Sequence, residues 1–220
     1  MPFRLPSSDL APNAAPQDLV RRRILQAAFS AFTESGYDQT STLQIASRAK
    51  VSKRELYALV GNKKETLVAC ISERAKRLQL PPDFPKASDR DTLMRALTGF
   101  GELVLRELSD PAVIAVYRIA IAEAHRLPEI AHTLDSKGRA TSRAALKEIL
   151  TPARSLGLLP GKVEEMLEQF FALLWGNLFA NLLLGLEDPP NLSEVRRRAR
   201  NATSAFLLLY CDREGGARRK

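Results

Sequence analysis

Apolar residues recur along this chain with the spacing of amphipathic helices. Near the N-terminus, residues at intervals of three and four form one apolar face: Leu25, Ala28, Phe29 and Phe32. This pattern predicts a helix over residues 18–35, with Asp18 as its N-cap and Gly36 ending it. No stretch alternates apolar and polar residues over the length of a strand, so the sequence predicts an all-α fold.

Two short helices joined by a tight turn are predicted next. Ser41 is placed as the N-cap of the first, with Gln44 as its capping-box partner, and Ser52 as the N-cap of the second. A fourth helix is expected over 63–79. A steep pair of compact helices is the usual device for placing one helix in the major groove of DNA.

Prolines at 81, 82 and 85 predict a short linker and a domain boundary. Longer helices are expected beyond it, over 89–108, 111–126, 128–155 (with a break near Pro152), 162–185 and 191–212. The predicted organisation is a flexible arm (1–17), a three-helix DNA-binding domain with its connecting helix (18–79), a larger helical domain (89–213), and a flexible tail (214–220).

The formal net charge of +8 suits a polyanionic partner. The excess of basic residues lies at the two ends, since residues 1–70 hold ten Lys/Arg against six Asp/Glu and residues 194–220 hold eight against three. The N-terminal 17 residues lack the apolar segment of a signal peptide. Cys70 and Cys211 have no metal-ligand spacing, and reduced cytosolic thiols are expected.

Residues 170–186 carry no charge and have close to the minimum length of a membrane span. Asn177 and Asn181 within the run favour a buried or interface helix instead, although a membrane-anchored regulator stays an alternative.

The helix beginning after Ser52 has a basic outer face. Leu56, Leu59 and Val60 are predicted to point inward, which leaves Lys53, Arg54, Tyr57 and Ala58 on the opposite side. Lysine and arginine donate to guanine or phosphate, and a tyrosine hydroxyl donates well to phosphate. An ordinary solvated basic face is the alternative that the charge pattern leaves open.

Residues 18–79 resemble the N-terminal domain of the TetR family of bacterial transcriptional regulators. The matching segments are Phe32-Thr33-Glu34-Ser35-Gly36-Tyr37, Thr40-Ser41-Thr42-Leu43-Gln44-Ile45-Ala46, Val51-Ser52-Lys53, Leu56-Tyr57 and Gly61-Asn62-Lys63. The resemblance implies a homodimer that reads a palindromic operator in double-stranded DNA. By the same resemblance, Thr40, Ser41, Tyr57 and Lys63 would contact phosphates, and Ser52, Lys53 and Arg54 would approach base edges.

Two positions depart from the family pattern. Lys50 stands where the turn usually has glycine, so a lysine at positive φ or an altered turn is expected. Glu55 places an acid close to the DNA, where it could accept from cytosine N4 or point away.

The last two predicted helices carry a seam of apolar and small residues, which in the family typically forms a four-helix dimer interface. The candidate interface residues are Phe170, Leu174, Asn177, Asn181, Ala199, Ala202, Phe206 and Leu209. Packing of the seam into the monomer's own core is the alternative.

The helix at 111–126 is nearly all apolar and is expected to be buried on most sides. In the family, the helices of this region enclose a pocket for a small effector. The candidate lining residues are Phe100, Tyr117, Arg118, Ile121, His125, Trp175 and Phe179, with ordinary core packing as the alternative for each.

The resemblance thus implies a cytoplasmic, ligand-responsive DNA-binding regulator, in this family most often a repressor released by a small molecule, with ligand binding and dimerisation in the helical domain 89–213. A DNA-binding regulator without an inducer is the alternative. No cofactor or metal is expected, and nothing in the sequence supports an enzyme, because nucleophile motifs and glycine-rich phosphate loops are missing.

Overall fold

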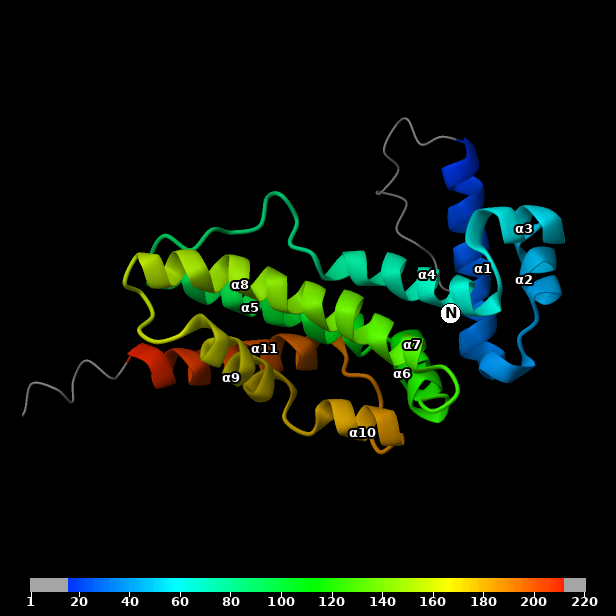
Figure 1. Ribbon diagram of the computed structural model, residues 1–220. Coiled ribbons are helices and arrows are strands. Elements are labelled where there is room, and N and C mark those ends of the chain that lie inside the picture. The colour runs from blue at the N-terminus through cyan, green and yellow to red at the C-terminus, as the bar shows by residue number, and fades with distance from the viewer. Residues whose placement is uncertain (1–15, 212–220) are drawn as a thin grey trace, which may run out of the picture. The chain divides into compact units, whose positions relative to one another are not determined.

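The computed structural model describes residues 16–211, and its regular structure over that range is helical (Figure 1). Contacts divide the chain into two compact units. The first contains residues up to Arg74 together with Ala115–Lys137, and the second contains Ala75–Ile114 and the chain from Gly138 onward. The segment 115–137 was predicted to belong to the C-terminal domain, so the contacts group it differently. The predicted arm and tail lie outside the described residues, apart from positions 16 and 17.

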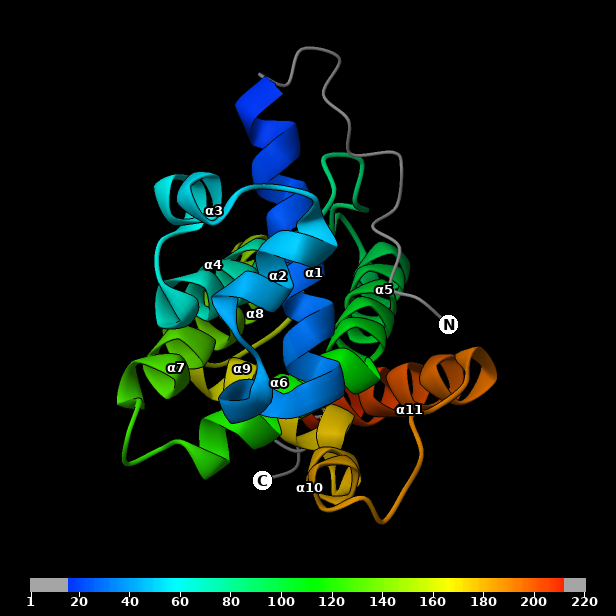
Figure 2. The same ribbon diagram turned by 90° about the vertical axis from the view of Figure 1, so that its right-hand side faces the viewer.

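In the first unit, α1 (Pro16–Gln39) contacts α2 (Thr42–Ala49) and α3 (Lys53–Val60), and α4 (Lys63–Ala75) follows. Figure 2 faces this group of helices. The side chains that α1 buries include the whole predicted apolar face, so that prediction is confirmed: Ile24, Leu25, Ala28, Phe29, Ala31 and Phe32.

The predicted start of the first helix is wrong, whereas its predicted end at Gly36 is confirmed. The helix already includes Pro16, so Asp18 lies in its first turn and not at its N-cap. At the other end Gly36 (φ 78°, ψ 174°) is not helical and ends the first helix as predicted, and a short helical segment follows across this kink to Gln39. A positive φ is readily adopted by glycine because it has no Cβ.

The first unit also contains most of α6 (Pro111–Ala122), followed by α7 (Pro128–Thr133). Helix 111–126 was therefore predicted four residues too long. A π-helical turn over Leu134–Arg139 then leads to α8 (Ala140–Ser155) of the second unit. The expected break near Pro152 is absent, since α8 continues through it.

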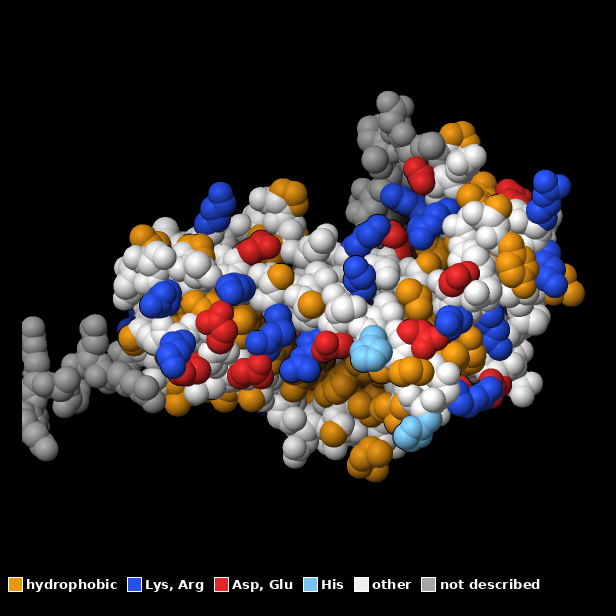
Figure 3. Space-filling model, viewed as in Figure 1, with side chains coloured by type: hydrophobic (Ala, Val, Ile, Leu, Met, Phe, Trp, Pro, Cys, Tyr) orange, Lys and Arg blue, Asp and Glu red, His pale blue; other side chains and the backbone are white. Residues whose placement is uncertain are grey.

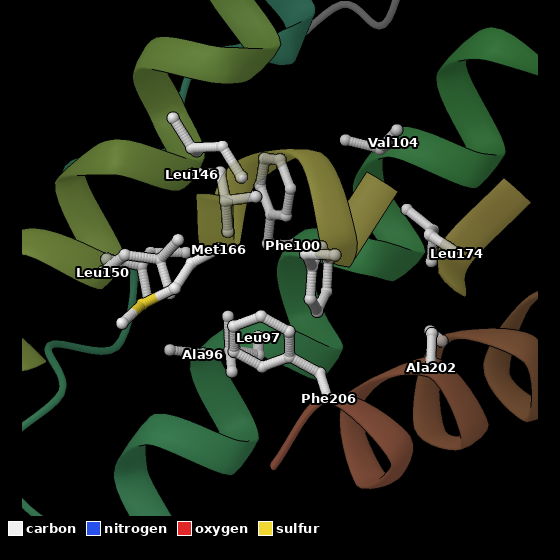
Figure 4. Packing of buried hydrophobic residues seen from close by; sticks show 14 of the residues in the cluster. Ala96, Leu97, Phe100, Val104, Leu146, Leu150, Met166, Leu174, Ala202 and Phe206 are labelled. Carbon is white, nitrogen blue, oxygen red and sulfur yellow. The ribbon is translucent and has the colours of Figure 1, made fainter. Parts of the chain in front are cut away.

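The second unit is built from a 3-10 turn (Lys76–Leu78), α5 (Arg90–Leu108), α8, α9 (Val163–Trp175), α10 (Leu178–Leu184) and α11 (Leu192–Cys211). Its core lies where α5, α8, α9 and α11 meet. Figure 4 shows part of this buried cluster, which includes Phe100 of α5, Met166 of α9 and Phe206 of α11. The rings of Phe170 and Phe206 meet edge to face at 5.4 Å between centroids, a favourable aromatic geometry.

The helix predicted over 162–185 is interrupted. Gly176 (φ 48°, ψ −125°) ends α9, and α10 starts two residues later. In the described part of the chain no single helix is long and apolar enough to span a membrane. The helices α9 and α10, bent by 54°, together have the length and apolar composition of a span.

Candidate nucleic-acid interface

The N-terminus of α2 is fixed by a side-chain cap. Ser41 has extended backbone angles and its Oγ accepts a hydrogen bond from the Gln44 amide at 3.1 Å, as predicted. This bond satisfies one of the amides that a helix leaves without an intrahelical acceptor. The Ser41 side chain is exposed, so the first turn of α2 lies at the surface.

Thr40 does not lie at that surface, which corrects its prediction as a phosphate contact. The residue is 1% exposed. Its hydroxyl lies 2.7 Å from the carbonyl oxygen of Gly36 and 3.1 Å from that of Ala31, both in α1. Thr40 therefore ties the start of α2 to the kinked end of α1, and its hydroxyl is occupied by the fold.

The turn between α2 and α3 depends on Lys50, whose φ of 54° and ψ of 49° are left-handed. Its amide donates to the carbonyls of Ala46 and Ser47, and the Val51 amide donates to Ala46 at 3.0 Å. Arg23 Nε donates to the Ala49 carbonyl at 2.7 Å. The predicted positive φ is confirmed, and α2 closes as helices that end in glycine do.

The α3 helix exposes the residues predicted for its outer face. Ser52 caps it through the Glu55 amide at 3.1 Å, while Leu56 and Val60 are buried. Lys53, Arg54, Tyr57 and Ala58 are exposed. Figure 3 shows basic and hydrophobic side chains next to one another over α2 and α3.

Tyr57 joins α3 to the start of α2. Its hydroxyl lies 3.5 Å from Thr42 Oγ1, and Lys53 Nζ lies 5.8 Å from the centre of its ring. These contacts bring Tyr57, Lys53 and the first turn of α2 together at one edge. Two hydroxyls and an ammonium group in such proximity form a set of donors suited to phosphate oxygens.

Lys63 lies at the start of α4 and is held by contacts with the end of α1. Its Nζ lies 4.3 Å above the Tyr37 ring and donates to the Asp38 carbonyl at 3.2 Å. Asn62 and Glu65 cap this helix reciprocally: the Asn62 amide donates to Glu65 Oε2 at 2.8 Å, and the Glu65 amide donates to Asn62 Oδ1 at 3.0 Å. Lys63 is half-buried, with its ammonium positioned by the end of α1.

Segment 115–137 is connected to this group of helices by ion pairs. Arg126 Nη1 lies 3.3 Å from Asp38 Oδ2 and 3.2 Å from Glu123 Oε2, and Lys64 Nζ lies 2.7 Å from Glu129 Oε1. The hydrogen bond from Lys64 lowers the pKa of the Glu129 carboxyl and raises the pKa of the Lys64 ammonium. The end of α1 and the start of α4 are therefore both bonded to the α6–α7 region.

Sequence reasoning missed three residues of this surface. Thr42 adjoins Tyr57, and Tyr37 holds Lys63. Leu43 is 66% exposed in the first turn of α2. Its exposure was available from the pattern, since Ile45, Ala46 and Ala49 already account for the buried side of the helix. The Tyr37–Lys63 contact has no comparable local signal, because it joins the ends of two helices.

Comparison with known proteins identifies this arrangement. Residues 24–70 match the model of the tetR family of bacterial regulatory proteins, and residues 95–212 match that of the AefR-like transcriptional repressor C-terminal domain. The chain belongs to the TetR family. It is accordingly a transcriptional regulator with a helix-turn-helix that binds DNA, and not an enzyme.

Individual relatives agree with this assignment. An uncharacterized HTH-type transcriptional regulator of Mycobacterium bovis is 28% identical over 124 residues, which cover 56% of this chain and 57% of that protein. A TetR regulator from Agrobacterium tumefaciens is 26% identical with a TM-score of 0.75, over 90% of this chain and 95% of that one. The flavonoid-responsive regulator FrrA is 26% identical with a TM-score of 0.68, over 88% and 97%.

The residues predicted to line an effector pocket of this TetR-family chain fall in both units. In the first unit Tyr117 is half-buried, whereas Arg118, Ile121 and His125 are exposed. Ile121 is 61% exposed, so the expectation that the predicted helix 111–126 buries it is wrong. The apolar pattern was misleading here because nearly every position of the helix is apolar.

In the second unit, Phe100 is fully buried and its ring lies 6.0 Å from those of Phe170 and Phe171. These contacts are the core packing that the sequence left open as an alternative. Trp175 and Phe179 are half-buried against the same core, with ring centroids 5.2 Å apart. Of the predicted lining residues in the second unit, Trp175 and Phe179 are the two whose side chains are partly exposed.

Five predicted interface residues are corrected by the structure, since each is at most 3% exposed within the monomer's own core: Phe170, Leu174, Ala199, Ala202 and Phe206. The seam there packs α9 and α11 against α5 of the same chain. Asn177 and Leu209 are exposed, and Asn181 is half-buried and donates to Glu187 at 2.7 Å. The apolar side chains that α9 and α11 leave at the surface include Leu173, Leu208 and Leu209.

Proposed function

We propose that this TetR-family protein is a homodimeric repressor that binds a palindromic operator in the cytoplasm and is released by a small molecule. The observation that carries the DNA-binding part is the edge formed by Tyr57, Lys53 and Thr42, beside the capped N-terminus of α2. Donors concentrated at a helix N-terminus are suited to phosphate.

The contacts support a division of roles among the exposed residues. Ser41, Thr42 and Tyr57 lie at one edge and would hold phosphates. Lys63 would reach a phosphate next to the start of α4 while keeping its contact with Tyr37. Arg54 and the exposed Ser52 at the start of α3 would approach base edges. Lys53, which the resemblance also placed at base edges, lies beside Tyr57 among the phosphate donors.

Release by an effector requires a mechanical connection to α4. The ion pairs of Arg126 with Asp38 and of Lys64 with Glu129 support one, because they join the α6–α7 region to both sides of the helix-turn-helix. An effector that displaces this region would pull on the start of α4 and alter the separation of the two recognition helices, which must match a helical turn of DNA.

The effector is proposed to be a small, partly apolar molecule. FrrA, which shares this chain's fold at 26% identity, is flavonoid-responsive, so flavonoids are a rational first set of compounds to test. A regulator that needs no inducer is the second candidate, and the close packing of Phe100 against Phe170 and Phe171 favours it.

Selection of bound sites from random double-stranded DNA tests the proposal. We expect an inverted repeat whose half-site centres are about 10 base pairs, or a multiple, apart. Operator affinity measured with and without each compound then separates the two candidates. Enrichment of no sequence would contradict operator reading, and affinity unchanged by every compound would favour the regulator without an inducer.

A further inference from the structure

Glu55 is an acid on a helix that otherwise presents donors to DNA. It lies in the first turn of α3 and is exposed, next to Arg54 and one turn before Leu59. Because DNA carries a negative phosphate at every nucleotide, a carboxylate on this surface opposes binding unless it meets a specific donor. An acid at such a position is therefore expected to have a role in the fold or in DNA recognition.

The ordinary structural role would be a capping box. Ser52-Lys53-Arg54-Glu55 has the required spacing, in which the glutamate side chain accepts from the N-cap amide. Only half of the box forms: the Glu55 amide donates to Ser52 Oγ, but among the described residues the Glu55 carboxylate accepts no hydrogen bond.

Glu65 provides an internal comparison. Its spacing from Asn62 is the same, and there both bonds of the box are made, at 2.8 and 3.0 Å. The geometry of a helix start in this chain thus permits a glutamate to turn back to its cap. The Glu55 side chain is directed elsewhere.

Neutralisation by a neighbouring cation is the second ordinary role, and it is also unfilled. Lys53 and Arg54 adjoin Glu55 in sequence, yet within residues 16–211 no ion pair of 4 Å or less involves the Glu55 carboxylate. Elsewhere in the same unit, acids such as Glu34 and Glu129 are paired, at 2.7 Å each.

The helical repeat places Glu55 relative to the other exposed side chains. With Leu56 and Val60 buried, the outward direction of α3 is centred on Arg54 and Ala58. Tyr57 flanks this direction on the side of Thr42, and Glu55 flanks it on the other side. Glu55 therefore borders the base-reading centre of the helix, away from the edge that holds phosphate donors.

We propose that Glu55 is a specificity-determining residue that accepts a hydrogen bond from the N4 amino group of a cytosine in the major groove. Cytosine N4 is the donor that glutamate pairs with at base edges; adenine presents its amino donor beside the N7 acceptor, and guanine or thymine presents acceptors that repel a carboxylate. The inference rests on the proposed function, because it requires α3 to enter the groove.

Site selection from random DNA with the wild-type protein and with Glu55→Gln tests the proposal. We expect the wild type to prefer cytosine at one position in each half-site. Replacing that base pair should weaken wild-type binding about tenfold. The same replacement, made to adenine, should change Glu55→Gln binding less than about twofold, because the glutamine amide also pairs with adenine N6 and N7. This variant should bind other sequences somewhat more tightly because phosphate repulsion is lost.

Glu34→Gln is the matched control, since it removes one acid of the same unit whose carboxylate is already paired with Arg48. It should keep the cytosine preference. Glu55→Gln should retain the wild-type melting temperature, because its carboxylate makes no bond within the described fold. An identical base preference in the wild type and Glu55→Gln, or no cytosine preference in the wild type, would overturn the inference. Failure of the wild type to enrich any sequence would instead contradict the proposed function.

Discussion

At the scale of single residues, Thr40 and Lys50 of the helix-turn-helix both have roles in the fold. Thr40 was expected to contact phosphate, and Lys50 was expected to have a positive φ or to alter the turn. The Thr40 hydroxyl donates to carbonyl groups of α1. Lys50 adopts a left-handed backbone conformation, which is costly for a residue that has a Cβ. The resemblance to the family, which usually has glycine at this position, led to the expectation of a positive φ at Lys50 or an altered turn, and the positive φ is found. The sequence could not predict the burial of Thr40, since that depends on the kink at Gly36.

Thr40→Val should destabilise the protein by about 1–2 kcal/mol, because a buried hydroxyl is replaced by a methyl group and the carbonyls of Ala31 and Gly36 lose their donor. Denaturant unfolding measures this change. The salt dependence of DNA binding should stay as in the wild type, because no phosphate contact is removed. A reduced salt slope would reinstate Thr40 as a phosphate contact.

Lys50→Gly should stabilise the protein by up to about 1 kcal/mol, since glycine adopts φ of 54° without the steric cost of a Cβ. Thermal and denaturant unfolding both report the change. Lys50→Ala, which keeps the Cβ and removes only the charge, is the control and should give little or no gain. Equal stabilisation by both variants would show that charge, not backbone strain, matters.

Cys70 should resist thiol reagents in the folded protein. It is buried, its Sγ lies 3.4 Å from the Leu25 carbonyl, and burial raises the pKa of its thiol well above the usual range. A Cys211→Ser background isolates its reaction, which should require denaturant. Since the folded pKa is the higher one, the stability contribution of Cys70 is complete below about pH 8.5, the unfolded pKa, and declines as the pH rises beyond it. Rapid labelling without denaturant would contradict this assignment.

At the scale of elements, the sequence was most informative where caps and periodicity agree. The starts of α2 and α3 follow from Ser41 and Ser52, and α5 begins one residue after the position expected. The long predicted helices were less accurate. An uninterrupted apolar run hides the break at Gly176, because a buried helix and two buried helices joined by a glycine have similar composition.

The ion pair between Arg126 and Asp38 connects elements far apart in sequence, and a double-mutant cycle can measure its contribution. Arg126→Glu should weaken operator binding by a fewfold, because like charges at 3.3 Å would separate the α6–α7 region from the end of α1. Combining it with Asp38→Lys should restore binding in part, because Glu123, the other partner of Arg126 at 3.2 Å, would still face a like charge. Both partners are exposed, so the coupling in thermal stability should be about 0.5 kcal/mol or less. Failure of the double variant to recover would argue against a role for this pair.

At the scale of the whole molecule, periodicity identified the seam on the last helices but not what covers it. Phe170, Ala199 and Phe206 have the spacing of an interface, yet α5 of the same chain occupies that side. A hydrophobic stripe shows that a face is buried, and sequence alone does not distinguish the chain's own core from a second copy.

The proposed dimer should therefore depend on the side chains that α11 leaves exposed. Leu208→Arg combined with Leu209→Arg should convert the dimer to a monomer in sedimentation experiments, because two charges would enter an apolar contact. Leu156→Arg, at an exposed leucine after α8, is the matched control and should leave the mass unchanged. A monomeric wild type, or a dimer that survives both changes on α11, would rule out this surface.

The contrast between the two glutamates at helix starts has a consequence for how such regulators diverge. Glu65 is bound into the start of α4 by two hydrogen bonds, whereas the Glu55 carboxylate takes part in none within the described fold. Mutation at position 55 therefore breaks no side-chain bond within the described fold, while mutation at position 65 breaks two. After a gene duplication, one copy could therefore change its base preference through position 55 without breaking a side-chain bond of the described fold.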